Sequence, residues 1–455
     1  MRRFGKVIGW GFVIVFVWTV TALRAEDRDS LSVRKWPDYI CADSNRITGN
    51  LTELDEVFRK WSAVGSDTAV VVSILHLGDS HIQAGFFSGA VRDSLQAVFG
   101  DAGRGLVAPL KLLGTNEPPD YTITSPNSWY GAKCVDLRPE EEVGVSGMVL
   151  ATSDREIEFR IEDKTPFDRV LAFHHARAPL LEVSDSLDAG IWCPEPSDEL
   201  TSIQLDSAVC RVVLKARVTD TAYAHPCFYG FSLDRTQNGV RYHSVGINGN
   251  TFSAFVRNPR IFEQAAWLEP DLVIVSLGTN DCSGSRFDRE FVERQVANLL
   301  DQIARSMPTA AVLMTTPMQC CRAVRSRGRI YRRENPHVAS MRKVILDEAD
   351  MRGIPVWDFY TVAGGRGAVT AWYGSGMMNR DRIHLTREGY QMQGEMLVEA
   401  LLAAYSDYLR RCAEVAPEKA DLSEMKRTDK QIRSKIATFV LLVLTGRSRT
   451  EKTDE

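Results

Sequence analysis

Apolar residues occur in two kinds of run, and the two kinds occupy different parts of the chain. At residues 69–99, and again from residue 241 onward, a β-branched run is followed by a turn and then by apolar residues at helical spacing. Strand-like runs lie at 69–78, 242–247, 271–277, 310–315 and 354–358, and helix-like stretches at 51–61, 86–99, 288–305, 336–351 and 387–411. Strands that alternate with helices predict a parallel sheet flanked by helices, with right-handed crossovers.

The region between residues 103 and 240 has a different pattern. It is rich in Gly, Pro, Ser and Asp, and its apolar residues alternate in short runs at 155–161, 169–173 and 209–218. Short, closely spaced strands without a long helical pattern predict an all-β sandwich or jelly roll. We therefore expect a split α/β domain (68–102 and 241–411), an inserted β-sandwich (103–240), an N-terminal segment (26–67) and a charged tail (412–455).

Some details of these elements are also predicted. The helix at 288–305 is expected to bury an apolar face made of Phe291, Val296, Leu299, Leu300 and Ile303. Arginines are frequent between positions 322 and 333, where a solvated surface is the plain interpretation and contact with an anionic polymer is the alternative. Aromatic residues of the insertion are either core residues or platforms for sugar rings: Trp129, Tyr130, Trp192, Tyr223, Phe228 and Tyr229.

The N-terminus has the layout of a secretory signal. Residues 1–6 are basic, residues 7–23 are uncharged and mostly apolar, and Ala25 offers a small residue at a cleavage point. Because the apolar part is long for a signal and Arg24 adjoins the cleavage point, an uncleaved membrane anchor within residues 1–25 is the alternative. By either route we expect an exported protein, periplasmic or anchored facing the periplasm.

Composition narrows the function classes. The 455 residues are 44% hydrophobic and 25% charged, which is typical of a globular protein. A net charge of −4 with both signs mixed argues against nucleic acid as a partner. The nine cysteines include no CxxC pair, so zinc-ribbon spacing is absent. Neither a metal nor an organic cofactor is expected.

Three fragments carry candidate chemistry. The strand-like run at 69–78 ends in Gly-Asp-Ser, which places the Ser80 hydroxyl at the carboxyl edge of a sheet, where ligands bind in open α/β folds. A serine needs a base, usually a histidine oriented by a carboxylate. His384, with Asp381 three residues upstream, is the best candidate for that pair. Asn280 follows the strand at 271–277 and reaches the same edge.

Acyl transfer also needs donors aimed at an oxyanion. The candidates are the backbone N–H of Ser80, the side-chain amide of Asn280 and the backbone N–H of Gly249, with Gly246 as a competitor for the last position. His81 adjoins the nucleophile and is a candidate for contact with substrate, with a structural role at the strand end as the equal alternative. Asp281 is a second such candidate, or a brace for the loop that holds Asn280.

In this order, Gly78-Asp79-Ser80, Gly249, Gly278-Thr279-Asn280-Asp281 and Asp381-Arg382-Ile383-His384 resemble blocks I, II, III and V of the SGNH (GDSL-like) hydrolases. The resemblance implies a flavodoxin-like parallel sheet. It also implies Ser80 as nucleophile, His384 as base, Asp381 as its orienting acid, and an oxyanion hole of Ser80, Gly249 and Asn280. The residue after Ser80 is His81 instead of the leucine of the GDSL label.

An SGNH domain interrupted between blocks I and II by a carbohydrate-binding-like β-sandwich resembles bacterial peptidoglycan O-acetylesterases. The resemblance implies an exported serine esterase that removes O-acyl groups, foremost O-acetyl groups, from a carbohydrate polymer or another ester. An O-acetyltransferase and a lipid or thioester hydrolase of the same fold are alternatives. A non-catalytic glycan-binding surface protein is the alternative from another class.

Overall fold

The computed structural model describes residues 35–64, 70–184, 195–196, 199–219, 225–326 and 328–415. The predicted signal or anchor segment lies outside these residues, as do Trp192, Tyr223 and all of the charged tail after residue 415. None of the helices in the described part of the chain combines the length and the apolar character that a membrane crossing requires.

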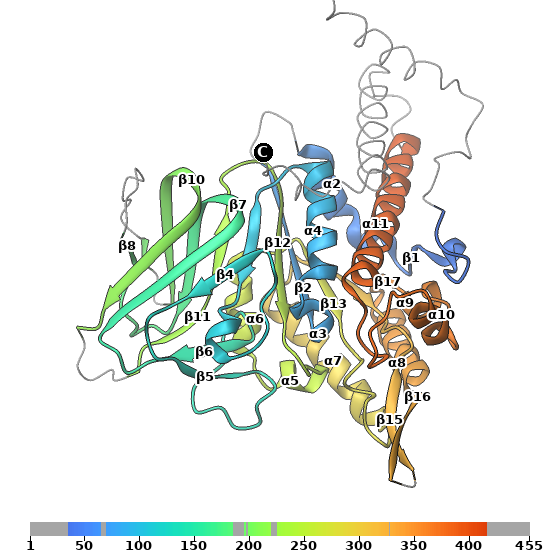
Figure 1. Cartoon of the computed structure of the whole chain (residues 1–455). Helices are drawn as coiled ribbons and strands as arrows, with labels where there is room; N and C mark the ends of the chain where they lie inside the picture. Colours follow the sequence, from blue (N-terminus) through green and yellow to red (C-terminus); the bar gives the residue numbers. More distant parts are fainter. Residues whose placement is uncertain are drawn as a thin grey trace, which may run out of the picture.

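A six-stranded sheet forms the centre of the α/β part (Figure 1). In spatial order its strands are β1 (Ile47–Thr48), β17 (Val356–Trp357), β14 (Ala311–Thr315), β13 (Leu272–Ser276), β2 (Val71–Gly78) and β12 (Gly239–Gly246). All neighbours are parallel except the short β1, which pairs antiparallel with β17. The five parallel strands therefore have the spatial order 2-1-3-4-5, as in flavodoxin-like folds.

This order fixes where a site can form. In a doubly wound sheet the crossovers leave a crevice at the carboxyl edge, where the strand order reverses. Here the reversal falls between β2 and β13, because β12 lies on one side of β2 and the later strands lie on the other. The loops that follow these strands carry Ser80 and Asn280. Sheet topology thus brings two sequence-distant loops to one point.

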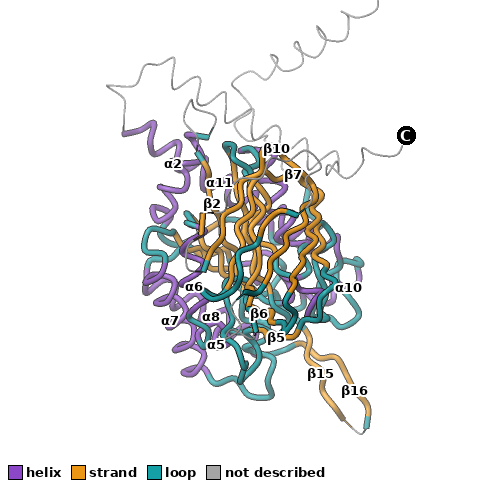
Figure 2. The backbone as a smooth tube through the Cα atoms, turned by 90° about the vertical axis from the view of Figure 1, so that its left-hand side faces the viewer, coloured by secondary structure: helices purple, strands orange, loops and turns teal. Residues whose placement is uncertain are grey.

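Both faces of the sheet are covered by helices (Figures 1 and 2). On one face lie α2 (Asp55–Ala63), α4 (Phe86–Phe99) and α11 (Arg387–Val415); on the other lie α5 (Phe252–Val256), α6 (Arg260–Ala265), α7 (Arg289–Ser306) and α8 (His337–Arg352). Successive residues of β2 point to opposite faces, so Ile74 packs in the first core and Leu75 in the second. Two cores explain why the central strands β13 and β14 are almost continuously apolar.

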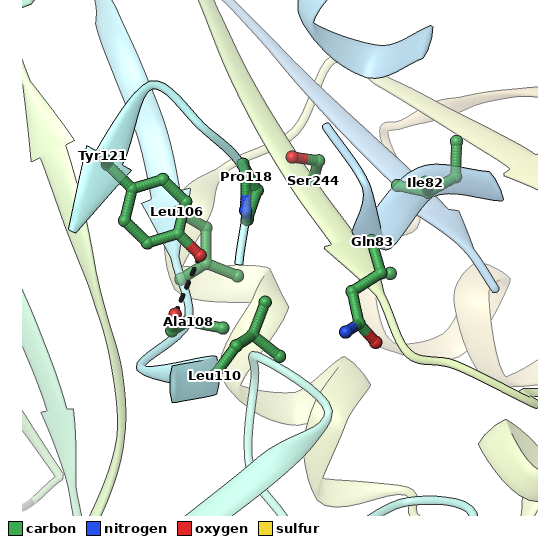
Figure 3. Close-up of a pocket in the computed structure, with 9 residues that line it drawn as sticks. Ile82, Gln83, Leu106, Ala108, Leu110, Pro118, Tyr121 and Ser244 are labelled. Atoms are coloured by element: carbon green, nitrogen blue, oxygen red, sulfur yellow. Dashed lines mark hydrogen bonds between the residues drawn. The ribbon is translucent and has the colours of Figure 1, made fainter. Parts of the chain in front are cut away.

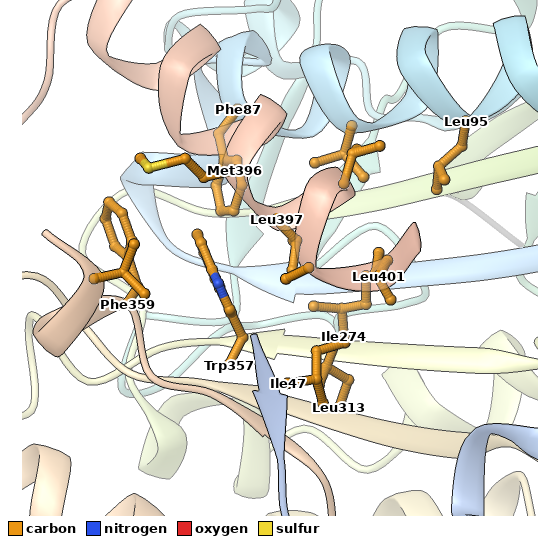
Figure 4. Packing of buried hydrophobic residues seen from close by; sticks show 14 of the residues in the cluster. Ile47, Phe87, Leu95, Ile274, Leu313, Trp357, Phe359, Met396, Leu397 and Leu401 are labelled. Atoms are coloured by element: carbon orange, nitrogen blue, oxygen red, sulfur yellow. The ribbon is translucent and has the colours of Figure 1, made fainter. Parts of the chain in front are cut away.

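Figure 4 shows the first core from close by. Phe87 and Leu95 of α4 face Leu397 and Leu401 of α11, and Ile274 of β13 closes the layer from the sheet side. Each of these side chains is fully buried. Because α11 begins just after His384, its packing on α4 anchors the loop that carries this histidine.

Nine antiparallel strands form the second sheet, which lies entirely between α4 and β12 in the sequence. They are β3 (Gly103–Val107), β4 (Tyr121–Thr124), β5 (Tyr130–Lys133), β6 (Met148–Ala151), β7 (Glu156–His174), β8 (Glu182–Val183), β9 (Glu195–Pro196), β10 (Leu200–Arg217) and β11 (Cys227–Asp234). The predicted fold class, a helix-flanked parallel sheet interrupted by an all-β insertion, is confirmed.

The insertion differs from the sequence prediction in one respect. The predicted strands at 155–161 and 169–173 are one continuous strand, β7. The residues between them resemble a turn, since they include Pro166, but they lie where β7 and β10 shift register. Pro166 takes no part in the paired register there, so its missing N–H costs the ladder nothing. The interruption of the apolar alternation therefore marks an irregularity within one strand and not the end of a strand.

Aromatic residues of the insertion are mainly core. Phe228 and Tyr229 are 1% and 2% exposed, and the Trp129 ring stacks on Phe159 with 4.8 Å between centroids. Tyr130 is the exception, at 42% exposed. The core interpretation therefore holds for three of the four predicted aromatics that the structure describes.

Two further corrections concern surface elements. Phe291 is exposed, and Val292 takes its place on the buried face of α7 with Val296, Leu299, Leu300 and Ile303. The positions 292, 296, 299, 300 and 303 follow helical spacing, whereas 291 lies one residue, or about 100°, off that face. The arginine-rich stretch forms a separate two-stranded hairpin, β15 (Cys321–Ser326) and β16 (Arg329–Glu334), which the hydrophobic pattern did not predict.

Candidate active site

Ser80 begins the one-turn helix α3 (Ser80–Gln83), directly after β2. The turn depends on Gly78: a Cβ there would lie 2.2 Å from Ile82 Cγ1 and 3.0 Å from the Ser276 carbonyl oxygen. Asp79 caps the helix, because its side chain accepts a hydrogen bond of 2.9 Å from the His81 N–H. Close packing and a cap together hold the Ser80 hydroxyl at the carboxyl edge of the sheet.

The loop before α11 carries the base and its carboxylate. One oxygen of Asp381 accepts the backbone N–H groups of Ile383 (2.9 Å) and His384 (3.0 Å). The other oxygen lies 2.6 Å from His384 Nδ1. Arg382, between them, has a positive φ of +57°, which a non-glycine residue adopts only when its surroundings hold it there. The tight loop therefore folds Asp381 back onto the imidazole.

Ser80 and His384, 304 positions apart, meet at a distance of 2.8 Å between Oγ and Nε2. A carboxylate can only accept, so Nδ1 carries the proton that is donated to Asp381. In that tautomer Nε2 is the acceptor of the Ser80 hydroxyl. This is the hydrogen-bond order that general-base activation of a serine requires.

The electrostatics suit that arrangement. Burial acts to raise the pKa of Asp381, but the hydrogen bonds from the His384 ring and from the backbone of Ile383 and His384 outweigh it, so the pKa lies below its ordinary value. The carboxylate therefore stays ionised at neutral pH and can stabilise an imidazolium. The side chains of His384 and Asp381 are each 36% exposed, so the pair faces an open surface.

The three predicted oxyanion donors are gathered around Ser80. Asn280 Nδ2 donates to Asp79 Oδ2 (3.1 Å) and to the carbonyl of Asn250 (3.0 Å), which ties the loop after β13 to the nucleophile turn and to the loop after β12. Within the described part of the chain, the backbone N–H groups of Ser80 and Gly249 donate to no acceptor. Gly249 has φ +82° and open space beside it.

The three donors differ in whether they already have a hydrogen-bond acceptor. The N–H groups of Ser80 and Gly249 are free to receive an oxyanion, whereas Asn280 must release one of its two present acceptors to join them. Gly246 belongs to β12, where its Cβ position would lie 2.2 Å from the Gln83 nitrogen, so it serves close packing. The geometry accordingly favours Gly249 over Gly246 for the loop donor.

His81 packs within the protein beside the base, and its predicted contact with substrate stays a prediction. Its Nδ1 is hydrogen-bonded to the Tyr390 hydroxyl at 2.8 Å, and its Nε2 is buried. The ring packs on His384, with 5.2 Å between the centroids. Burial lowers the pKa of His81, which keeps the ring neutral beside the base. The structure makes it a packing partner of His384, because the helix turn directs it inward.

Asp281 is likewise turned into the protein. One carboxylate oxygen accepts the Phe252 N–H at 3.0 Å, and the other is buried without a partner in the described structure. Burial raises the pKa of Asp281 to about 7. The hydrogen bond to Phe252 is the contact expected of the other predicted role, a brace between the loop after β13 and the start of α5, while contact with substrate stays a prediction.

The sequence pattern did not predict a polar network that lies beside the nucleophile. Gln83 Oε1 accepts the backbone N–H of Asn248 at 2.6 Å, directly before Gly249. Gln83 Nε2 donates to Thr115 Oγ1 (2.9 Å) and to the Asn116 carbonyl (2.8 Å), both in the insertion. The insertion therefore helps to position the loop that carries Gly249. In the sequence, the one signal for this role of Gln83 is its position three residues after Ser80.

A pocket lies next to this network, between α3, β12 and the first part of the insertion (Figure 3). It is lined by both apolar and polar groups: Ile82, Gln83, Leu106, Ala108, Leu110, Pro118, Tyr121, Ser244 and Gly246. Tyr121 closes one wall and donates its hydroxyl to the Ala108 carbonyl at 2.8 Å. Neither Ser80 nor His384 lines it, so the reacting groups lie on the open surface outside this pocket.

The histidine in the centre of β2 has a structural role. His76 in β2 is fully buried between the Tyr242 hydroxyl and the Ser276 hydroxyl, each at 2.7 Å. Burial lowers the pKa of His76 to about 3, so it stays neutral. In the part of the chain that the structure describes, no three His, Cys, Asp or Glu side chains are grouped so that they could hold a metal ion.

The sequence of residues 218–392 matches the model of the GDSL-like Lipase/Acylhydrolase family. The match contains Gly249, Asn280, Asp381 and His384, while Ser80 lies before it, on the far side of the insertion. The resemblance to SGNH/GDSL-like hydrolases is thereby confirmed, and with it the predicted enzyme class, a carboxylic ester hydrolase. No match was found among curated proteins.

Solved structures extend the comparison to the insertion. A structure titled "Peptidoglycan O-acetylesterase in action, 5 min" superposes with a TM-score of 0.65 at 18% identity, covering 79% of this chain and 99% of that one. The lipase/acylhydrolase from Enterococcus faecalis matches with a TM-score of 0.28 at 21% identity, covering 36% of this chain and 76% of its own. The first match shows a shared fold across both sheets.

Proposed function

We propose that this chain is an exported serine esterase that removes O-acetyl groups from a carbohydrate polymer such as peptidoglycan. The single observation that carries the proposal is the hydrogen-bonded series from Ser80 Oγ through His384 to Asp381, at 2.8 and 2.6 Å. The match to an acylhydrolase family supports the reaction class. The neighbour named as a peptidoglycan O-acetylesterase, which shares the fold over most of this chain, supports the choice of a glycan ester.

In the proposed reaction, Ser80 Oγ attacks the ester carbonyl carbon while His384 Nε2 takes the hydroxyl proton. The tetrahedral oxyanion is stabilised by the free N–H groups of Ser80 and Gly249, joined by Asn280. His384 returns the proton to the departing sugar alkoxide, which leaves an acyl-enzyme on Ser80. Water, deprotonated by His384, then releases acetate and restores the serine.

The openness of the site supports hydrolysis of a large substrate. With about a third of the His384 and Asp381 side chains exposed, water reaches the acyl-enzyme freely. A transferase would have to shield that intermediate, and a lipase would have to enclose an acyl chain. A non-catalytic binding protein would have no use for the ordered bonds among Ser80, His384 and Asp381. The geometry thus favours the esterase among the alternatives.

The test is labelling with a fluorophosphonate probe together with acetate release from O-acetylated peptidoglycan, O-acetylated xylan and p-nitrophenyl acetate. We expect labelling of the wild-type protein and none of Ser80→Ala, with acetate release lost in the same variant. Ser232→Ala, in the insertion, is the matched control and should label normally. Equal acetate release by wild type and Ser80→Ala would overturn the mechanism.

A further inference from the structure

The β15–β16 hairpin stands apart from the rest of the fold. It forms its own two-stranded sheet and projects from the body below α8 (Figures 1 and 2). An isolated hairpin is at best marginally stable in water, so its retention calls for a use outside the core. Near its tip, Ile330 is 64% exposed and Tyr331 is 44% exposed. The tip is therefore built for contact with something other than the protein body.

The hairpin carries a large excess of positive charge. Its two described strands contain five arginines and one acidic residue, Glu334, although the whole chain has a net charge of −4. The Glu334 carboxylate accepts a hydrogen bond from the backbone N–H of Gly367, at 2.9 Å. Among the described residues no carboxylate pairs with the four exposed arginines, Arg325, Arg329, Arg332 and Arg333. Elsewhere on the surface arginines are commonly paired, as Arg211 is with Glu162 at 2.8 Å.

The strand register places Arg322, Arg329 and Arg333 on one face of the hairpin and Arg325 and Arg332 on the other. Arg322 pairs directly with Arg333, and Val324 with Tyr331, so by alternation these four side chains share one face, which Arg329 extends toward the tip. Like charges directly opposite each other destabilise a strand pair. An anion between them removes that repulsion, and the Tyr331 ring beside them offers a flat apolar surface. Arginine is also suited to bidentate contact with carboxylates.

Both ends of the hairpin are attached to the active-site loops. The Cys321 N–H donates to the Arg382 carbonyl at 2.8 Å, between Asp381 and His384. At the other end, Asn335 Nδ2 donates to the Cys282 carbonyl at 2.8 Å, two residues after Asn280. A polymer that lies along the hairpin is therefore directed toward the loops around Ser80.

We infer that the β15–β16 hairpin is a docking arm for an anionic glycan, a sugar polymer with carboxylates, whose ester-bearing unit it presents to Ser80. The inference rests on the proposed function and narrows its substrate class from glycans in general to carboxylated ones. The carboxylates pair with the exposed arginines, and sugar rings lie against Tyr331. The attachment of the hairpin to the active-site loops favours a substrate polymer over a lipid surface as its occupant.

The experiment neutralises the arm and compares substrates. Arg329→Gln, Arg332→Gln and Arg333→Gln are combined in one variant. Its matched control combines Arg160→Gln, Arg211→Gln and Arg217→Gln, which removes the same charge from the insertion. Both are assayed with O-acetylated peptidoglycan, with chemically O-acetylated dextran as a neutral polymer, and with p-nitrophenyl acetate. The small ester reports whether each variant is folded and active.

For the hairpin variant we expect the KM for O-acetylated peptidoglycan to rise at least about tenfold at low salt, because steering by local charge is lost. The difference from wild type should shrink in about 0.5 M salt, where surface charges are screened. Dextran ester and p-nitrophenyl acetate should be hydrolysed as by wild type, and the control variant should match wild type on all three. An unchanged KM on peptidoglycan, or an equal loss in the control, would overturn the inference.

Two further experiments separate the alternatives. Sedimentation of Ser80→Ala with de-O-acetylated peptidoglycan measures docking without turnover, and adding the three hairpin substitutions should abolish it. This binding experiment still tests the role of the hairpin if the wild-type protein releases no acetate. Failure of the wild-type protein to release acetate would overturn the proposed function. If the hairpin substitutions abolish binding to phosphatidylglycerol vesicles but leave binding to peptidoglycan unchanged, the hairpin is a membrane-docking element. That result would overturn the inference that it docks a glycan.

Discussion

Two histidines show how differently the two sheets use the same side chain. His384 lies in a loop at the carboxyl edge of the parallel sheet, with its side chain 36% exposed and its ring nitrogens bonded to Ser80 and Asp381. His174 ends β7 in the antiparallel sheet, 1% exposed, with its ring nitrogens bonded to the Thr201 hydroxyl and the His175 carbonyl. The first ring is placed for chemistry and the second completes a core.

The difference follows from sheet geometry. Parallel strands direct successive loops to one edge, so polar residues from distant parts of the chain converge where no strand neighbour uses them. In an antiparallel sheet each position faces a neighbour on the adjacent strand, and buried polar groups are satisfied there. Catalytic potential is therefore expected at the edge of the first sheet, and mainly structural roles are expected within the second.

The largest contrast is expected between His384→Ala and His174→Gln. Loss of the base should lower kcat for p-nitrophenyl acetate by roughly 10⁴-fold, whereas His174→Gln should leave kcat unchanged and lower the free energy of unfolding by about 1–3 kcal/mol. Steady-state kinetics and urea unfolding of both variants measure this. A loss of less than tenfold in His384→Ala would remove the catalytic side of the comparison.

Phe159→Ala addresses the aromatic residues of the insertion. Phe159 is fully buried and packs on Phe228 and Phe231, with centroid distances of 5.2 and 5.0 Å. We expect a loss of about 3–5 kcal/mol in the free energy of unfolding and unchanged turnover of p-nitrophenyl acetate by the folded variant. Unchanged stability combined with weaker glycan binding would show instead that this cluster serves as a sugar platform.

Asn280→Ala tests the third donor. If the amide joins the oxyanion hole during the reaction, kcat should fall by about 10²–10³-fold with little change in KM. Asn258→Ala is the matched control, because in the described structure that amide donates to the Cys134 and Ala254 carbonyls. A fall of only a few-fold in Asn280→Ala would mean that the two free N–H groups of Ser80 and Gly249 suffice.

Asp281→Asn is expected to change the pH dependence of stability. Burial raises the pKa of Asp281 from the ordinary 3.8 to about 7 in the folded state, so the folded protein holds this proton more tightly than the unfolded chain. Its stabilising contribution is complete below pH 3.8 and is lost as pH rises through about 7. Relative to wild type, the variant should therefore gain on the order of 3–4 kcal/mol between pH 4 and pH 8.

Urea unfolding of both proteins at several pH values measures that gain, and the difference between them isolates this one group. A difference that stays constant across the range would show that Asp281 is ionised in the folded protein. The same series carried out with Asp163→Asn, whose pKa burial also raises in the insertion, extends the comparison to the second sheet.

Much of the parallel domain was predictable because its signals are local. The β-branched run before Gly78 and the apolar spacing in α4 each specify an element without reference to the rest of the chain. The candidate site was predictable because Ser80, Asn280, Asp381 and His384 all follow or precede such elements. The continuity of β7 was not, since only the pairing with β10 shows that Pro166 lies at an irregularity.

The elements and the reacting side chains could be predicted from the residues alone, because short-range periodicity and turn chemistry depend on neighbouring residues. The packing of His81 on His384 and the hydrogen bond by which Asp281 braces a loop are visible only in the folded protein. The same is true of the hairpin that the arginine stretch forms and of its attachment to the loop of His384. These roles depend on which side chains meet across hundreds of residues, and contacts of that range arise only once the sheets have packed.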